Sequence, residues 1–359
     1  MEPRSHVARQ LRDQARSCAE MGSPLYAHLL VKAATDVEAS GPCWEVLSRH
    51  VAPGRGDAVA LRFLAAVHRL VLSGRAPGLA RRYPSAGGRP DERVWQEFRG
   101  LVEAEPDALR ALTARPCQTN EVGRAAPLMF GFLAVAAEWG LPLRVLELGA
   151  SAGLNLRFDH FRYGLDTVNW GDPKSPVDLT GLWREAPPDL AASLVVAARR
   201  GCDRNALDPS DHESRLTLRS SVWADQTERL ARLEGALELA ARIPAVVDAV
   251  AISDWLPEQL ASTHRGLATV VYHSVVVEYL PEEAQRDLAA TLAAAGSRAT
   301  PEAPLGWLRL EPISGERHHG VTLTTWPGGR ERLLAFSGAH GADVATPGPL
   351  GSFGGSLLC

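Results

Sequence analysis

The spacing of apolar residues along this chain changes near residue 143. Before that point apolar residues recur every three or four positions, as in amphipathic helices. After it, short apolar runs alternate with helical segments, which is typical of an α/β domain with a largely parallel sheet. We therefore predict an all-helical N-terminal domain over residues 1–125, an α/β domain over 126–345 and a loose tail, rich in Gly, Pro and Ser, over 346–359.

The second part of the chain contains the apolar runs that predict its strands. They span residues 143–148, 194–198, 246–252, 269–273, 305–310, 321–325 and 332–336. Helical spacing fits residues 227–242 and 281–295. The last two runs are joined by Trp-Pro-Gly-Gly-Arg at 326–330, a hairpin-like connection that predicts an antiparallel last strand.

Composition narrows the class of protein. Hydrophobic residues make up 45% of 359 residues, enough for a sizeable core, and a net charge of −4 gives no general attraction to nucleic acid or to anionic membranes. The sequence shows neither a signal peptide nor an apolar stretch of about 18 residues, so we expect a cytoplasmic protein without a membrane partner. Five scattered cysteines without a C-x-x-C pair predict neither a disulfide framework nor a metal site.

The most informative segment is a glycine-rich turn after the first apolar run. Small residues permit a tight turn and close approach of a ligand to the backbone, and the helix that follows presents free N–H groups. The acid before the first glycine, Glu147, suits the cationic amino-acid end of S-adenosylmethionine better than a nicotinamide cofactor, for which Gly-x-Gly-x-x-Gly is expected. The predicted cofactor-binding residues of this turn are Glu147, Gly149, Ala150, Ser151, Gly153 and Asn155.

An acid also follows the second run. Asp203 is the candidate for binding ribose hydroxyls, with an Asx-turn or helix cap as its structural alternative. It lies 54 residues past Gly149 rather than the usual ~20, so we predict an inserted β-excursion around residues 161–176. Asp166 and Asp172 are the alternative ribose acids.

Polar residues at the next two strand ends complete the predicted pocket. Asp254 is expected to accept the adenine amino group and Trp255 to cover the ring, unless Ser253 or Asp254 is a helix N-cap. His273 is a candidate general base that also contacts the cofactor, the alternative being a satisfied buried histidine. Glu278 and Tyr279 follow it and are expected to bind substrate.

A polar cluster just before the first strand is expected to cover the same pocket. Thr119 fits an N-cap, but Asn120, Glu121 and Arg124 are harder to explain by capping. We predict that Asn120 and Arg124 bind substrate and that Glu121 is a second candidate base.

With these motifs in place, the chain resembles over most of its length a bacterial family of unassigned function, domain of unknown function 2332. The matching segments are 119–124, 147–155, 201–209, 222–226 and 273–274. The chain departs from the usual family form at Ala206 and Ala224, where proline is more common. The resemblance implies a Rossmann-like class I methyltransferase fold with a mostly parallel sheet, and it implies the cofactor more than the reaction.

The leading hypothesis is therefore an S-adenosylmethionine-dependent methyltransferase that acts on a small-molecule acceptor, with a homodimer as the candidate assembly. One alternative keeps the scaffold but catalyses a cyclisation, isomerisation or elimination. Another makes Ser151 a hydrolase nucleophile, because residues 149–153 match Gly-x-Ser-x-Gly, with Asp254 and His273 or His340 as its partners.

Overall fold

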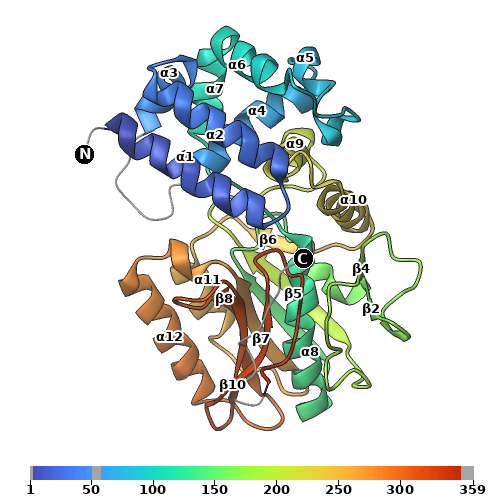
Figure 1. Ribbon diagram of the computed structural model, residues 1–359. Helices are drawn as coiled ribbons and strands as arrows, with labels where there is room; N and C mark the ends of the chain where they lie inside the picture. The colour runs from blue at the N-terminus through green and yellow to red at the C-terminus, as the bar shows by residue number, and fades with distance from the viewer. Residues whose placement is uncertain (1–2, 51–57, 349–359) are drawn as a thin grey trace. The chain divides into compact units, whose positions relative to one another are not determined.

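A computed structural model describes residues 3–50 and 58–348 (Figure 1). The chain divides into two compact units, which are described separately. One is formed by the residues up to Thr119 together with Ser210–Leu233, and the other by Asn120–Pro209 together with the residues from Glu234 onward. Most of the tail that was expected to be loose lies outside the described residues.

The described residues of the first unit form helices around one apolar core. Proline occupies the first position of several of them, where its missing N–H costs no helical hydrogen bond. The elements are α1 (Pro3–Glu20), α2 (Pro24–Glu38), α3 (Pro42–Leu47), η1 (Ser48–His50), α4 (Val59–Leu72), α5 (Pro77–Ala80), η2 (Pro84–Ala86), α6 (Val94–Ala104), α7 (Pro106–Thr113), α9 (His212–Ser221) and the beginning of α10 (Thr227–Arg242).

The second unit is built on a seven-stranded, mostly parallel sheet, as predicted for an α/β protein. Each of the predicted apolar runs contributes a strand, and the order across the sheet is β10-β9-β8-β7-β1-β5-β6. The strands are β1 (Leu143–Leu148), β5 (Val196–Cys202), β6 (Val246–Asp248), β7 (Ala268–Ser274), β8 (Leu305–Pro312), β9 (His319–Trp326) and β10 (Arg330–Ser337).

The direction of the last strand differs from the prediction. A short turn after β8 places β9 beside it in antiparallel orientation, and the 327–329 hairpin then places β10 beside β9. β9 is therefore the strand that runs against the sheet, and β10 again runs parallel to β8. The predicted antiparallel pairing of the last two strands is confirmed, but the assignment of the reversed direction to the last strand is wrong.

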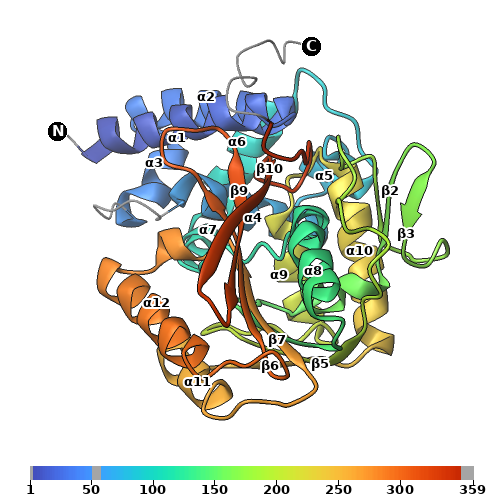
Figure 2. The same ribbon diagram turned by 90° about the horizontal axis from the view of Figure 1, so that it is seen from below.

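Helices cover both faces of this sheet (Figure 2). α8 (Ala125–Trp139) packs on one face, where a Cβ on Gly131 would lie 2.2 Å from Leu308 Cδ1, so glycine permits the close approach. α11 (Ile252–Gln259) and α12 (Glu282–Gly296) cover the other face over an apolar cluster that includes Leu146 and Leu148. The 3-10 segments η4 (Leu154–His160) and η5 (Val277–Tyr279) follow β1 and β7, and η3 (Val122–Arg124) directly precedes α8.

The insertion after the glycine-rich turn forms a small sheet of its own. Its order is β3-β2-β4, from β2 (Arg162–Leu165), β3 (Val168–Trp170) and β4 (Asp178–Thr180). This confirms the predicted β-excursion and explains the long separation between Gly149 and Asp203. No described helix has the length and apolar character needed to cross a membrane.

Candidate functional site at the carboxyl edge of the sheet

The candidate site lies where the chain reverses its direction of progress across the sheet. β1 pairs with β5 on one side and with β7 on the other, so its carboxyl end marks the switch point at which open α/β sheets bind ligands. The chain adopts the left-handed backbone conformation just after β1, at Ser151 (φ 53°), and just after β7, at Val275 (φ 55°). A β-branched residue such as Val275 rarely adopts this conformation, and strained backbone of this kind clusters at functional sites.

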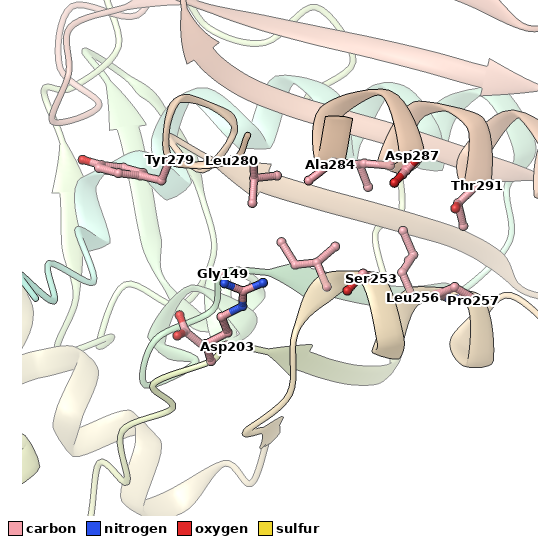
Figure 3. A pocket seen from close by; sticks show the side chains of 13 residues that line it. Gly149, Asp203, Ser253, Leu256, Pro257, Tyr279, Leu280, Ala284, Asp287 and Thr291 are labelled. Carbon is pink, nitrogen blue, oxygen red and sulfur yellow. The ribbon is translucent and has the colours of Figure 1, made fainter. Parts of the chain in front are cut away.

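A pocket of about 350 Å³ opens beside this switch point (Figure 3). Its two long walls are α11 and α12, and Gly149 and Asp203 lie together at one end of it. The lining is mostly apolar with a few polar groups, as in small-molecule sites. The lining residues are Gly149, Asp203, Arg204, Ile252, Ser253, Leu256, Pro257, Tyr279, Leu280, Ala284, Asp287, Leu288 and Thr291.

Asp203, the candidate ribose-binding acid, lines the pocket and also organises the turn. Its Oδ2 accepts a hydrogen bond from the Ser151 amide at 2.9 Å, and its Oδ1 accepts one from the Asn205 amide at 2.8 Å. Each carboxylate oxygen keeps a further lone pair that could accept a hydroxyl. The Asx-turn that was the structural alternative for Asp203 is therefore also formed, because the same carboxylate caps its own loop and borders the pocket.

The backbone amides of the glycine-rich turn are less available than the sequence suggested. The Ser151 amide bonds to Asp203, the Ala150 amide to the Cys202 carbonyl at 3.0 Å, and the Leu154 amide to Asn120 Oδ1 at 3.0 Å. Of the six predicted residues of the turn, Gly149 lines the pocket, and the other five are not among its lining residues. Gly149 itself is closely packed, because a Cβ there would lie 2.7 Å from Val276 Cγ2.

Glu147 lies on the other face of the sheet from the pocket. Its neighbours Leu146 and Leu148 belong to the cluster under α11 and α12, so strand alternation directs Glu147 toward α8. There it is 3% exposed beside its register partner Tyr272, and burial raises its pKa to about 8 against the opposing effect of the Tyr272 hydroxyl. A buried, protonated carboxyl does not suit the predicted contact with a ligand ammonium.

Asp254 and Trp255 do not line the pocket. α11 begins at Ile252, and the lining residues Ile252, Ser253 and Leu256 share the helix face toward α12. Asp254 is exposed, whereas Trp255 is 3% exposed and donates its indole N–H to Asp248 Oδ2 at 2.6 Å. The predicted placement of Asp254 and Trp255 in the pocket is therefore corrected: Ile252, Ser253 and Leu256 of the same helix line it instead.

His273 has no free nitrogen for catalysis. It is 0% exposed, and its Nδ1 lies 2.6 Å from Glu311 Oε1 while its Nε2 lies 3.0 Å from the Trp307 indole nitrogen. An indole N–H can only donate, so Nε2 accepts and the proton of a neutral imidazole resides on Nδ1 and is donated to Glu311. The geometry supports the structural alternative, in which His273 is a buried histidine with both ring nitrogens hydrogen-bonded. For the same reason His273 cannot act as the base of a hydrolase that uses Ser151 as its nucleophile.

The polar cluster before β1 ties loops of the second unit together. Asn120 accepts from the Leu154 amide, and the Glu121 carbonyl accepts from Asn155 Nδ2 at 3.0 Å. Arg124 donates to the backbone carbonyl of Ser274, at 3.3 Å, and to that of Ala339. Asn120, Glu121, Arg124 and Asn155 are absent from the lining of the pocket, so their contacts favour an architectural role.

The two predicted substrate residues after β7, Glu278 and Tyr279, differ in their position relative to the pocket. Tyr279 lines the pocket with 59% of its surface exposed, and in Figure 3 its side chain extends away from the slot. Glu278 is exposed and does not line it. Among the described residues, no group of three His, Cys, Asp or Glu side chains is arranged to hold a metal ion.

Sequence reasoning missed most of the pocket lining. Ala284, Asp287, Leu288 and Thr291 recur every three or four positions on α12, a spacing that is visible in the sequence. The spacing predicts a helix face but not what the face borders. These residues could be recognised only once α12 was placed against α11.

Comparison with known proteins gives a family and no activity. A family described as "Uncharacterized protein conserved in bacteria (DUF2332)" matches residues 8–345. No curated protein and no solved structure matches the chain.

Proposed function

This chain belongs to the DUF2332 family, and we propose that it is a Rossmann-like, class I methyltransferase whose pocket between α11 and α12 binds the nucleoside end of S-adenosylmethionine. The methyl acceptor would be a small molecule. One observation carries the proposal: the acid that follows the second parallel strand, Asp203, borders an apolar slot at the switch point of the sheet together with Gly149.

The residues of the pocket fit a nucleoside. A planar base would lie between the apolar side chains of α11 and α12, chiefly Ile252, Leu256 and Leu288. Asp203 would accept the ribose hydroxyls on the lone pairs that the turn leaves unused. Gly149 would border the ligand at the end of β1.

The chain's part in catalysis would be to position the reactants and exclude water. When bound, S-adenosylmethionine supplies an electrophilic methyl group. The apolar walls keep water from the slot, and holding the ligand by its nucleoside fixes the direction in which its other end faces. The proposal assigns no role as base to His273, whose two ring nitrogens are both bonded, and no ligand contact to Glu147, which faces the side of the sheet away from the pocket.

Titration calorimetry with S-adenosylmethionine and S-adenosylhomocysteine tests the proposal. We expect saturable binding of both, and we expect Ala284→Leu, which fills the slot from α12, to weaken it at least tenfold. Ala290→Leu makes the same change on an exposed part of the same helix and should leave binding unchanged. No heat from either compound at millimolar concentration would reject the cofactor, and equal binding by the Ala284 variant would place the ligand elsewhere.

A second function on the same scaffold has one observation in its favour. The protonated state of Glu147 and the bonded amides of the turn leave the methionyl end of the cofactor without the contacts that the sequence suggested. This favours a nucleoside-containing ligand other than S-adenosylmethionine, and hence a reaction without methyl transfer. Adenosine binding that equals or exceeds S-adenosylhomocysteine binding, and substrate conversion without the mass of an added methyl, would support this alternative.

A further inference from the structure

A second cavity lies on the other side of α12 from the first. Its volume is about 330 Å³, and it is bounded by α12, by the segment after β7 and by the face of β8, β9 and β10. It shares Leu288 with the first pocket but none of that pocket's acids. The lining residues are Val277, Gln285, Leu288, Trp307, Arg309, Glu311, Pro312, Ile313, Gly320, Thr322 and Glu331.

Glu311 brings a negative charge to this cavity. Its Oε1 accepts three hydrogen bonds, from His273 Nδ1 at 2.6 Å and from the amides of Val276 and Val277 at 3.0 and 3.4 Å. Burial alone would raise the pKa of Glu311, but the hydrogen bond and charge interaction with His273 and the bonds from the two amides lower it below its ordinary value, so the side chain is ionised near neutral pH.

Among the described residues, no lysine or arginine side chain pairs with Glu311, and its contact with His273 involves Oε1 alone. The second oxygen of Glu311, Oε2, is buried and has no hydrogen-bond partner within the described part of the chain. An ionised carboxylate with an unsatisfied oxygen favours a ligand that donates hydrogen bonds and carries positive charge.

The other charges of the cavity cancel each other. The Arg309 guanidinium lies 4.0 Å from the centroid of the Trp307 ring, and its Nη2 pairs with Glu331 at 2.5 Å. The remaining walls, such as Leu288 and Ile313, are apolar. The cavity therefore offers the unpartnered carboxylate oxygen of Glu311 beside space for an uncharged body.

We propose that this cavity is a second ligand site, which binds a small organic cation, a protonated amine on an apolar or aromatic body, with Glu311 as its counter-ion. The site does not depend on S-adenosylmethionine or on methyl transfer. An organic cation fits this site better than a metal ion, because no group of three His, Cys, Asp or Glu side chains among the described residues is arranged to hold a metal and Glu331 is already paired with Arg309.

Nuclear magnetic resonance of the tryptophan indole groups tests the site in the full chain, with phenethylammonium and neutral 2-phenylethanol as matched probes. The Trp307 indole signal, assigned by its loss in Trp307→Phe, should shift saturably with phenethylammonium. 2-Phenylethanol, which has the same shape without the charge, should bind at least tenfold more weakly. Because the two probes are compared on the unsubstituted protein, Trp307→Phe is needed only to assign the signal and does not affect the ratio of the two affinities.

Glu311→Gln keeps a carbonyl that can accept from His273 and from the two amides, and it removes the charge. It should weaken phenethylammonium binding about tenfold and leave 2-phenylethanol binding unchanged. Glu316→Gln removes the same charge from an exposed residue of the β8–β9 turn outside the cavity and should have no effect. Equal binding of the two probes, an unmoved Trp307 signal, or equal effects of the two substitutions would overturn the proposal.

Discussion

Substituting Glu147 by glutamine should stabilise the protein in a pH-dependent manner. Glu147 is 3% exposed at the end of β1, and burial raises its pKa from an ordinary 4.5 to about 8. The folded chain thus holds a proton that the unfolded chain releases between these two pH values. The unfolded state binds fewer protons throughout that window, so the free energy of unfolding falls as pH rises from about 4.5 to 8.

The size of this effect follows from the width of the window. Each pH unit between the two pKa values corresponds to about 1.4 kcal/mol, so the full loss amounts to about 5 kcal/mol. Glutamine has nearly the same shape and carries no charge at any pH in this range. Relative to wild type, Glu147→Gln should therefore gain stability steadily from pH 5 to pH 8 and no further above it.

Urea unfolding of both proteins, followed by tryptophan fluorescence at half-unit intervals from pH 4.5 to 9, measures this difference. Taking the difference cancels the other titrating groups, including the buried His68, whose pKa is lowered to about 4 by burial. Glu258→Gln, an exposed site on α11, provides the control and should give a flat difference. A flat difference for Glu147→Gln as well would mean that Glu147 is ionised in the folded protein, and it would restore this residue as a partner for a ligand ammonium.

Three further substitutions test hydrogen bonds that lie within one unit or the other. Asp225→Ala removes the acceptor of the Ser23 hydroxyl and of the Leu25 amide at the beginning of α2, and it should lower the stability of the first unit by about 1–2 kcal/mol in urea unfolding. A loss below about 0.3 kcal/mol would contradict a capping role for Asp225. Trp255→Phe leaves Asp248 without its indole donor and should cost about 1 kcal/mol, with the apolar contacts mostly kept; an unchanged urea midpoint would contradict the bond. Asn120→Ala should expose the Leu154 amide to hydrogen exchange as well as cost about 1–2 kcal/mol, and continued protection of that amide would refute the assignment.

The strands of the second unit could be predicted because the sheet is covered on both faces. Burial on two sides makes the central strands β1 and β7 mostly apolar, and such runs stand out between helical segments, whereas β5 and β10 are partly exposed and include charged residues. The hairpin at residues 327–329 could also be predicted, from its Pro-Gly-Gly sequence. The sequence did not show which of the last strands is reversed, because the direction depends on whether the chain crosses the sheet after β8 or turns back at once. It turns back, and β9 pairs with β8 in antiparallel orientation.

The grouping of residues 210–233 with the first unit had no local signal. α9 has an ordinary beginning, with Asp211 accepting from the Ser214 amide, and its pattern does not indicate which core it joins. Its membership rests on long-range contacts such as that of Asp225 with Ser23, which are 202 residues apart. Local periodicity predicts that a helix has a buried face, and the partner of that face is a property of the whole chain.

The orientation of Glu147 shows why a motif can be located correctly and its chemistry misjudged. Side chains alternate along a strand, so Glu147 and Leu148 face opposite sides of the sheet. The pocket lies on the side of Leu148, under α11 and α12, and this excludes the Glu147 carboxyl from it. The alternation was available from the sequence, but the side that carries the pocket was not.

Polar residues at the carboxyl ends of parallel strands meet two demands that sequence patterns do not separate. Loops that leave a sheet contain amides and carbonyls that must be bonded when they are buried, and side chains such as Asn120 and Asp203 bond them. A ligand site at the same edge requires the same kinds of side chain. Asp203 accepts hydrogen bonds from the turn and also borders the pocket. His273 differs, because both of its ring nitrogens are bonded, to Glu311 and to Trp307. In this fold the residues that bind a ligand are therefore to be sought where a polar group keeps unused hydrogen-bonding capacity beside an apolar wall, a criterion that Asp203 meets in the first pocket and Glu311 in the second.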